Sequence, residues 1–205
     1  KDLLDEDVDV LCVKGSGWDM ANIEPAGMPA VRLATLRKLR SRSALPDEEM
    51  VRLQRAALID PQSPNPSVET LLHAFVPHKF VDHTHATAVL SLIDQTESEA
   101  LCAENFGDRL GFVPYVMPCF ALAKKAAQVF EKNPAVEGLI LDKHGIFTFG
   151  DDAREAYERM IEFVTLAEER LRKKGNAKLP GAKLPERVAL VSDVAPIIRG
   201  VCAQR

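Results

Sequence analysis

The spacing of hydrophobic positions divides most of the chain into short strands and amphipathic helices. Apolar or alternating runs predict strands at residues 8–13, 80–85, 110–113, 138–143 and 146–149. Apolar positions three and four residues apart predict helices near residues 31–41, 47–57, 68–76, 86–93, 96–105 and 122–130, and a long one from Asp151. This alternation indicates an α/β fold in which a central sheet carries helices on its faces. The sheet is expected to be mixed or antiparallel, because residues 138–149 have the pattern of a hairpin.

The long helix from Asp151 shows the helical period most clearly and marks the end of the predicted domain. Its apolar stripe consists of Ala153, Ala156, Tyr157, Met160, Val164, Ala167 and Leu171. Beyond Lys173 the sequence becomes polar and carries Gly175, Pro180, Gly181 and Pro185. We therefore expect one domain over residues 1–172, followed by a polar linker or tail over 173–205 with a short helix near 193–203.

Length and composition are those of a globular domain and exclude several other classes. The chain has 205 residues, which is enough to bury a substantial core. Its net charge of −4 lacks the basic excess typical of nucleic-acid-binding proteins, and its apolar runs are too short to span a membrane. The acidic N-terminus is unlike a signal peptide, and the four cysteines are scattered along the chain. These features predict a cytoplasmic protein with reduced thiols.

Three histidines form the strongest candidate for chemistry. His83 and His85 flank Thr84 at the end of an apolar run, and side chains i and i+2 of a strand point to the same face. A second apolar run ends at His144. Three converging imidazoles that leave a fourth position open are typical of a catalytic zinc site. Spacing alone leaves a second interpretation open, because many histidine pairs of this kind are merely solvated.

Glu69 and a glycine-rich turn are weaker candidates. Glu69 precedes His73 by one helical turn, where a carboxylate either complements the helix dipole or, beside a metal ion, moves a proton. The turn Lys14-Gly15-Ser16-Gly17 lacks the pattern of a nucleotide-binding loop, and is either an ordinary tight turn or a site for one anion. We expect His73 to lie in the core and His78 to be exposed.

Three separate motifs together resemble the class II aldolase/adducin family. They are Pro66-Ser67-Val68-Glu69, Val81-Asp82-His83-Thr84-His85-Ala86, and Lys143-His144-Gly145-Ile146 followed by Gly150-Asp151. Their order and separations match as well, over roughly residues 8–172. Within the family, the segments Lys14–Asp19, Asn65–His73 and Phe80–His85 look most like the aldolase portion of bifunctional rhamnulose-1-phosphate aldolase/alcohol dehydrogenases. The resemblance implies a three-layer α/β/α sandwich that assembles as a homotetramer with active sites at subunit interfaces.

The same resemblance implies a metal centre and a reaction. His83, His85 and His144 would bind Zn²⁺ or another divalent first-row metal, and Glu69 would be the acid/base that also reaches the metal in the resting site. Tyr115 would protonate the departing aldehyde. The implied reaction is the reversible cleavage of a ketose 1-phosphate, a small-molecule sugar phosphate, to dihydroxyacetone phosphate and a hydroxyaldehyde. The metal would stabilise the enediolate that this cleavage forms.

An anion pocket is implied too, with two departures from the family pattern. Gly15, Ser16, Gly17 and Ser67 would line the pocket for the phosphate or distal anion. The family's second serine in this region is Val68 here, so one hydroxyl is lost. The family also has a Gly-Asn-rich turn before the first residue of this sequence, so we expect the N-terminal part of the family fold to be absent. Both departures concern the phosphorylated substrate and leave the metal ligands intact.

Three alternative functions follow from the same comparison of motifs. Epimerases and decarboxylases use the same metal scaffold, and an adducin-like structural module keeps the fold without catalysis. Non-catalytic relatives have lost metal-binding histidines, whereas this chain has all of its candidate ligands, which favours an enzyme. A redox metalloprotein is disfavoured, because no cysteine or methionine lies near the motifs to tune copper or iron.

Overall fold

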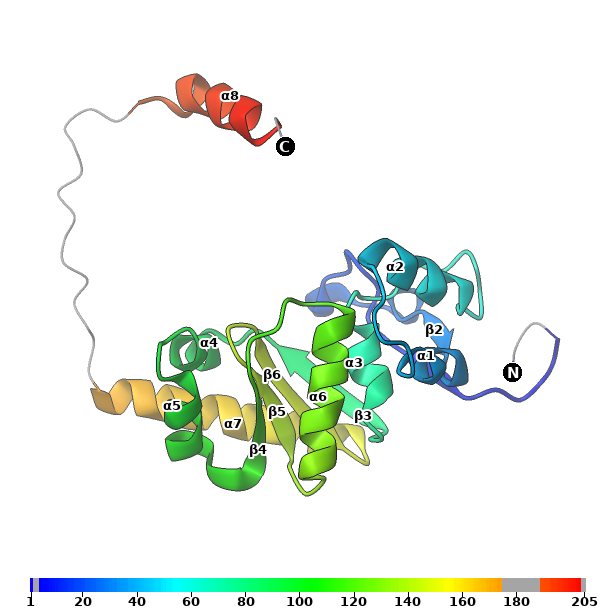
Figure 1. Ribbon diagram of the computed structural model, residues 1–205, viewed down its shortest axis with the longest axis horizontal. Helices are drawn as coiled ribbons and strands as arrows, with labels where there is room; N and C mark the ends of the chain where they lie inside the picture. The colour runs from blue at the N-terminus through cyan, green and yellow to red at the C-terminus, as the bar shows by residue number, and fades with distance from the viewer. Residues whose placement is uncertain (2–3, 175–188, 204–205) are drawn as a thin grey trace. The chain divides into compact units, whose positions relative to one another are not determined.

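A computed structural model of the chain describes residues 1, 4–174 and 189–203 (Figure 1). The chain divides into two compact units, Lys1–Lys173 and Lys174–Arg205, which are described separately. Of the polar linker or tail predicted over residues 173–205, residues 175–188 and 204–205 lie outside the described residues. In the second unit, the described part contains helix α8 (Val191–Cys202), close to the helix expected near residues 193–203.

A four-stranded mixed sheet forms the centre of the first unit. Its strands lie in the order β3 (Phe80–Thr84), β6 (Gly145–Gly150), β5 (Gly138–Leu141) and β4 (Leu110–Val113). β6 pairs antiparallel with both β3 and β5, whereas β4 and β5 are parallel. The expected hairpin over residues 138–149 is therefore confirmed. The parallel pair β4–β5 is connected through a helix, α6 (Phe120–Lys132).

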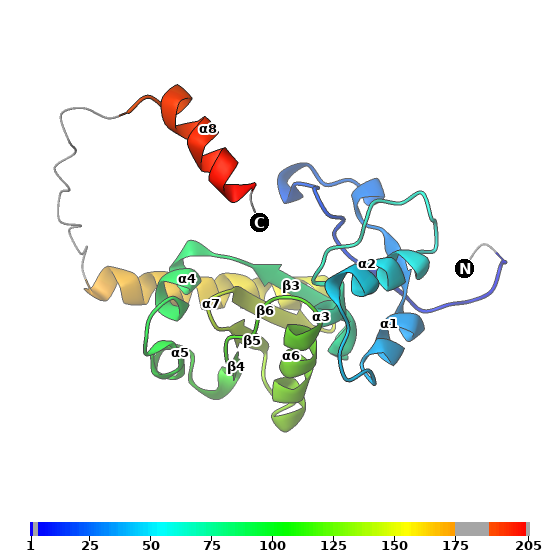
Figure 2. The same cartoon turned by 45° about the horizontal axis from the view of Figure 1, so that its top comes forward.

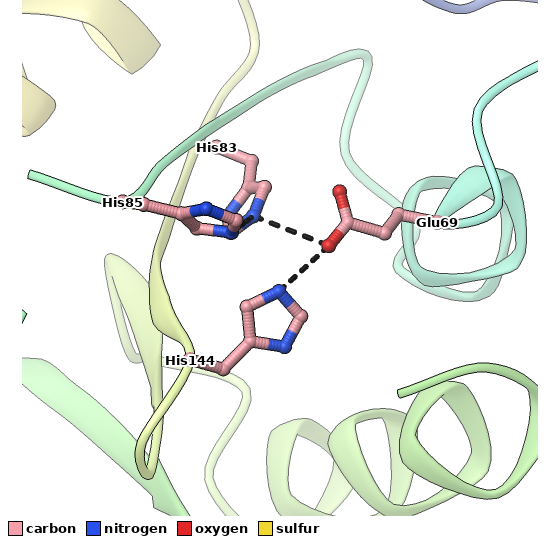
Figure 3. Close-up of side chains that lie close together, drawn as sticks. All are labelled: Glu69, His83, His85 and His144. Atoms are coloured by element: carbon pink, nitrogen blue, oxygen red, sulfur yellow. Dashed lines mark hydrogen bonds and ion pairs between the residues drawn. The ribbon is translucent and has the colours of Figure 1, made fainter. Parts of the chain in front are cut away.

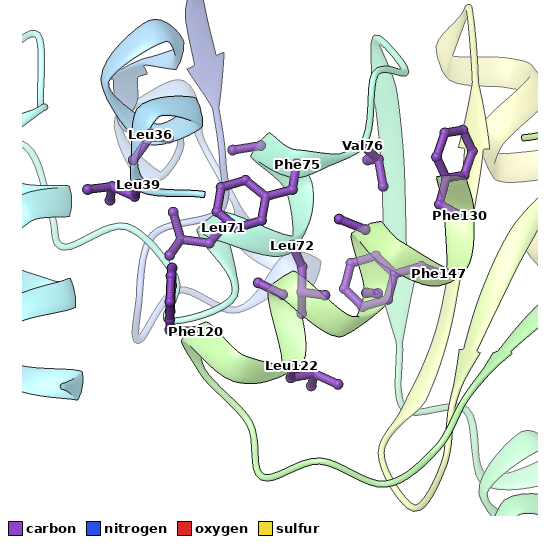
Figure 4. Close-up of a cluster of buried hydrophobic side chains, with 14 of the residues drawn as sticks. Leu36, Leu39, Leu71, Leu72, Phe75, Val76, Phe120, Leu122, Phe130 and Phe147 are labelled. Atoms are coloured by element: carbon purple, nitrogen blue, oxygen red, sulfur yellow. The ribbon is translucent and has the colours of Figure 1, made fainter. Parts of the chain in front are cut away.

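Helices cover both faces of this sheet and give the three layers of an α/β/α sandwich (Figure 2). α6 and α3 (Thr70–Phe75) lie on one face, and α4 (Thr87–Ile93), α5 (Ser98–Phe106) and α7 (Ala153–Lys174) lie on the other. Alternating side chains of the strands supply the two hydrophobic clusters: Leu139 and Leu141 join the first, and Ile140 joins the second. Figure 4 shows the first cluster, in which Leu72 of α3 and Leu122 of α6 pack near Phe147 of β6.

The N-terminal segment extends the first cluster beyond the sheet. β1 (Val10–Cys12) and β2 (Ala30–Arg32) form a separate antiparallel pair, followed by α1 (Leu33–Leu39) and α2 (Asp47–Ala56). Short 3-10 turns at Met20–Asn22 and Pro25–Gly27 connect the two strands, and a third, Gly107–Arg109, precedes β4. Leu36 and Met50 are fully buried and join these helices to the main core.

Three elements differ from the sequence-based expectation. The helix expected at residues 31–41 begins later, because residues 30–32 pair with β1 as an additional strand. The helix expected from Val68 begins at Thr70, since the Thr70 amide and hydroxyl both donate to the Ser67 carbonyl and close a turn first. On α7, Tyr157 is 60% exposed, because the buried stripe follows Ala156, Met160, Phe163 and Ala167. No helix in the described ranges is both long and apolar enough to cross a membrane.

Candidate metal centre

The candidate ligands come from the ends of two neighbouring strands and from the start of a helix (Figure 3). His83 is on β3 opposite Phe147 of β6, and its ring stacks on that phenyl ring with centroids 4.1 Å apart. His85 follows directly after the end of β3, and His144 lies in the tight turn between β5 and β6. Because β3 and β6 are adjacent and antiparallel, the end of one strand meets the beginning of the other.

Glu69 lies at the start of α3 and its carboxylate reaches the three imidazoles. Glu69 Oε1 is 2.7 Å from His144 Nε2 and 3.4 Å from His83 Nε2. The Nε2 atoms of His83 and His85 are 3.0 Å apart, and the four donor atoms all lie within 4.8 Å of one another. The sequence motifs predicted this meeting of His83, His85 and His144 with Glu69, and the structure brings all four together.

The donor set and its geometry fit a divalent metal ion. Two ligand atoms about 2.1 Å from a zinc ion, at a tetrahedral angle, are about 3.4 Å apart, close to the separations found here. His83 Nδ1 is 2.9 Å from the Ile146 carbonyl oxygen, which can only accept, so Nδ1 carries the proton. His83 Nε2 therefore presents a lone pair to the centre, as metal-binding histidines do. A divalent cation bound between these groups would satisfy the lone pair and the carboxylate together.

Backbone conformation at the β5–β6 turn brings His144 into the site. Lys143 has a positive φ of 56°, a conformation that lets the chain reverse in a few residues. Gly145 packs directly behind the ligands: a Cβ there would lie 2.6 Å from the Thr84 carbonyl oxygen, 2.9 Å from His85 Cδ2 and 3.0 Å from His83 Cε1. Glycine is therefore required next to His144 for the strands and rings to approach. The glycine is visible in the motif Lys-His-Gly, but the need for it comes from contacts with β3 that only the tertiary structure shows.

The surroundings of Glu69 and His85 shift their pKa values in the directions that favour binding of a cation. Burial alone would raise the pKa of the Glu69 carboxyl, but the neighbouring imidazoles of His144 and His83 lower it well below its ordinary value. The pKa of His85 is lowered by burial and by the charges of His83 and His144. At neutral pH the carboxylate is ionised and the His85 imidazole is neutral, which are the forms that bind metals.

Comparison with known proteins assigns the chain to a family. The family model for the Class II Aldolase and Adducin N-terminal domain matches residues 3–171. The chain belongs to the class II aldolase and adducin family. The solved N-terminal class II aldolase domain of a conserved protein from Thermoplasma acidophilum is 37% identical, with a TM-score of 0.79 over 83% of this chain and 79% of that chain.

Two further relatives of this class II aldolase domain are informative. A sugar-phosphate aldolase from Thermotoga maritima is 20% identical, with a TM-score of 0.56 over 85% of this chain and 78% of that one, a likeness that shows the fold alone. The protein named "Uncharacterized oxidoreductase YuxG" of Bacillus subtilis strain 168 is 36% identical over 211 residues, which cover 100% of this chain and 31% of the relative. The chain thus spans about a third of the length of that relative.

The predicted anion-binding residues of this class II aldolase domain lie together. Gly15 forms an isolated antiparallel bridge with Pro66, the Ser16 amide donates to the Asn65 carbonyl, and the Ser67 amide donates to the Lys14 carbonyl. Ser67 Oγ accepts from the Glu69 amide at 3.2 Å, which links the turn to the metal centre.

Fewer groups of this turn remain for an anion than its glycine-rich sequence implies. The amides of Gly15 and Ser16 already donate to carbonyls, so they are not available to a ligand. The hydroxyls of Ser16 and Ser67 and the exposed backbone at Gly17 remain as the candidate contacts. Their role in binding phosphate stays a prediction.

Tyr115 is not joined to the four candidate ligands by any hydrogen bond among the described residues. Its side chain is 51% exposed in the loop after β4, and its hydroxyl contacts Met117 Sδ at 3.9 Å. Among the described residues, no hydrogen bond or ion pair joins it to Glu69 or to the histidines. Its role as a proton donor stays a prediction, and it depends on a substrate or a second chain completing the site.

The two remaining histidines lie on the sheet face that α3 and α6 cover. His73 packs edge-on against Phe147, with ring centroids 5.3 Å apart, and burial lowers its pKa to about 4. His78 was expected to be exposed, and this is wrong: its ring stacks on Phe149 and meets the edge of Phe130. His78 Nδ1 also lies 3.9 Å from Asp151 Oδ1, so ring packing and this contact account for the two residues without a catalytic role.

Proposed function

We propose that this chain is a zinc-dependent aldehyde-lyase of the class II aldolase type. Its substrate is a ketose 1-phosphate similar to rhamnulose 1-phosphate or fuculose 1-phosphate, which it cleaves to dihydroxyacetone phosphate and a hydroxyaldehyde. The observation that carries the proposal is the meeting of one carboxylate with three imidazoles whose donor atoms lie within 4.8 Å of one another. Three histidines with an exchangeable fourth ligand form a catalytic rather than a structural type of zinc site.

Each residue of the centre has a separate task in this proposal. His83, His85 and His144 would hold the zinc ion, which when bound acts as a Lewis acid toward the oxygens of the substrate. The Glu69 carboxylate, ionised at neutral pH, accepts or returns a proton at the substrate carbon or oxygen beside it. The His83 ring is held in orientation by its hydrogen bond to the Ile146 carbonyl oxygen, so its lone pair stays directed at the centre.

The remaining groups bind the substrate and complete the reaction. The phosphate is held by Ser16, Gly17 and Ser67, and Gly15 shapes the turn. The contact between Ser67 and the Glu69 amide sets the distance between the phosphate and the metal. Tyr115 donates a proton to the aldehyde oxygen in the condensation direction and takes that proton back when the ketose is cleaved. A homotetramer would supply the surroundings of that exposed tyrosine, and Met117 beside it is 69% exposed and apolar, as a surface covered by another copy would be. The setting proposed is the cytoplasm, with a sugar phosphate as the only partner besides further copies of the chain.

Two other uses of the same residues remain distinct outcomes of the test. An epimerase or a decarboxylase would need the same four side chains, because both reactions also develop negative charge beside a carbonyl group. An adducin-like module would need none of them, which the presence of the complete set argues against. The name oxidoreductase belongs to a relative about three times as long as this chain. That name therefore also describes sequence that this chain does not contain.

A condensation assay tests the proposal directly. Zinc-loaded protein is incubated with dihydroxyacetone phosphate and a panel of hydroxyaldehydes, and new ketose phosphates are detected by mass spectrometry. Wild-type protein should form a ketose. Glu69→Gln should keep zinc but lose activity by about 10²- to 10⁴-fold, the usual contribution of a general acid/base. His85→Ala should lose most of the bound zinc, and the exposed Glu169→Gln serves as the matched control.

The results separate the alternatives. Near-normal turnover by Glu69→Gln would refute the acid/base role. Failure of zinc-loaded wild-type protein to form any ketose would refute the aldolase assignment. Epimerised sugar phosphate or released carbon dioxide in parallel incubations would instead indicate the sister reactions.

A further inference from the structure

Two cationic side chains flank the turn that approaches the metal centre, and neither has a carboxylate partner. Lys14 is half-buried, and its Nζ donates to the carbonyl of Gly15 at 3.3 Å. Arg55 is exposed at the end of α2, and its Nη1 donates to the side-chain oxygen of Asn65. In the described part of the chain, neither forms an ion pair, whereas most of the other arginines with a described partner are paired with glutamates.

A chain of hydrogen bonds places Arg55 beside the turn. The side chain of Asn65 accepts from Arg55, and the main-chain carbonyl of the same residue accepts from the Ser16 amide at 2.7 Å. The guanidinium is therefore separated from Ser16 by a single residue. Because guanidinium has five N–H donors and Asn65 uses one, the others remain to contact a ligand.

Open space lies over the turn at the same point. Gly17 has a positive φ of 84°, and a Cβ built there would meet no atom within 4 Å. Its neighbours Gly15 and Gly27, in contrast, are tightly enclosed by Trp18 and other atoms. The turn is thus tightly packed at Gly15 and open at Gly17, and Ser16 between them is exposed.

The charges and donors of this turn suit a dianion better than a neutral group. Two cations without carboxylate partners would compensate a phosphoryl group, which carries close to two negative charges at neutral pH. Charge-assisted hydrogen bonds from arginine to phosphate oxygens are strong and directional, because the planar donors match the oxygen spacing. These bonds would also compensate for donors that the turn cannot offer to the anion. The amides of Gly15 and Ser16 already have partners, and Val68 has no hydroxyl.

We propose that Arg55 and Lys14 are specificity-determining residues that select a substrate with a terminal phosphoryl group at the turn formed by residues 14–17 and 65–67. This inference rests on the proposed function, because it concerns the far end of the same substrate. Arg55 binds the phosphoryl oxygens directly, and Asn65 holds the guanidinium in place. Lys14, which precedes Gly15 of the Gly15–Pro66 bridge, adds the second positive charge.

Calorimetric titration of the zinc-loaded protein with inorganic phosphate tests this assignment, with acetate as the monoanion control. Arg55→Gln should weaken phosphate binding by about 10- to 100-fold, as expected for loss of a charge-assisted hydrogen bond. Arg55→Lys should recover part of that loss, and Lys14→Gln should weaken binding in the same direction. Arg52→Gln, an exposed arginine on the same helix, is the matched control and should bind phosphate as the wild type does. Phosphate bound at the zinc itself would be equal in all variants and would cancel in the comparison.

Each outcome decides one point. Equal phosphate affinity in Arg55→Gln and Arg52→Gln would overturn the role of Arg55, and acetate bound as tightly as phosphate would overturn selection of a dianion. Zinc content, measured on the same samples, should be unchanged in every variant, so a loss of zinc in Arg55→Gln would also count against a role confined to the turn. Arg55-dependent phosphate binding without any ketose formation would sustain this inference while refuting the aldolase assignment.

Discussion

Replacing Gly145 by alanine tests how tightly the metal centre is built. The added Cβ would lie 2.6 Å from the Thr84 carbonyl oxygen and 3.0 Å from His83 Cε1, against an ordinary contact of at least 3.4 Å. Something must therefore move by roughly 0.4 to 0.8 Å, and the Thr84 carbonyl belongs to paired backbone that cannot give easily. The His83 and His85 rings are the softer neighbours, so the displacement falls on the ligands.

The size of that displacement sets the expected effect. Metal–ligand distances tolerate errors of about 0.2 Å, so a shift of the rings by twice this amount or more should spoil the coordination. We expect zinc affinity to fall by about 10- to 100-fold, the range found when groups that orient metal ligands are altered. Overpacking should also lower the free energy of unfolding by about 1–3 kcal/mol.

A matched substitution in the same sheet separates the two effects. Gly111→Ala on β4 places its Cβ 2.7 Å from Leu139 Cδ2 and 3.1 Å from Val129 Cγ1, which are ends of flexible side chains and not metal-ligand candidates. Both variants should unfold at lower urea concentration, but only Gly145→Ala should bind zinc more weakly in competition with a chromogenic chelator. If Gly145→Ala bound zinc as tightly as Gly111→Ala does, the close packing behind the histidines would not be what orders the site.

Two further predictions concern stability. Because burial lowers the pKa of His73 to about 4, the unfolded chain binds a proton between pH 6.5 and 4 that the folded chain does not. The stability of the metal-free protein should therefore be full above pH 6.5 and fall as the pH drops toward 4; urea unfolding at pH 7 and 5 measures this, and His73→Phe should show a smaller fall. Arg109 binds both Glu137 and Glu162, so Arg109→Ala should lower the free energy of unfolding by about 1–2 kcal/mol. Arg154→Ala is the control, because the Arg154 side chain is 84% exposed. If both variants changed the free energy of unfolding by the same small amount, the ion pairs of Arg109 would not contribute to stability.

Most of the elements could be predicted from the sequence, because their patterns are local. The apolar run at residues 138–149 predicted a hairpin, and β5 and β6 form it with the turn at residues 142–144. Strand β2 was not predicted, because three residues followed directly by a helix do not show an alternating pattern. Tyr157 was assigned to the buried stripe of α7, although which side of a helix faces the sheet is decided by the partners it packs against.

What the sequence alone determined is the set of groups able to bind a metal. His83 and His85 share a face through strand geometry and His144 ends the second apolar run, which made them candidates, and the family motifs then favoured a metal site over solvated histidines. The family motifs implied that Glu69 reaches the metal, but only the tertiary structure gives its contact with His144, 2.7 Å between Glu69 Oε1 and His144 Nε2 across 75 residues of sequence. Local patterns also did not show that the Ile146 carbonyl orients His83, that atoms pack closely against Gly145, or that the Gly15 and Ser16 amides already have partners. Distances between remote segments depend on how the whole core packs, and no local pattern encodes them.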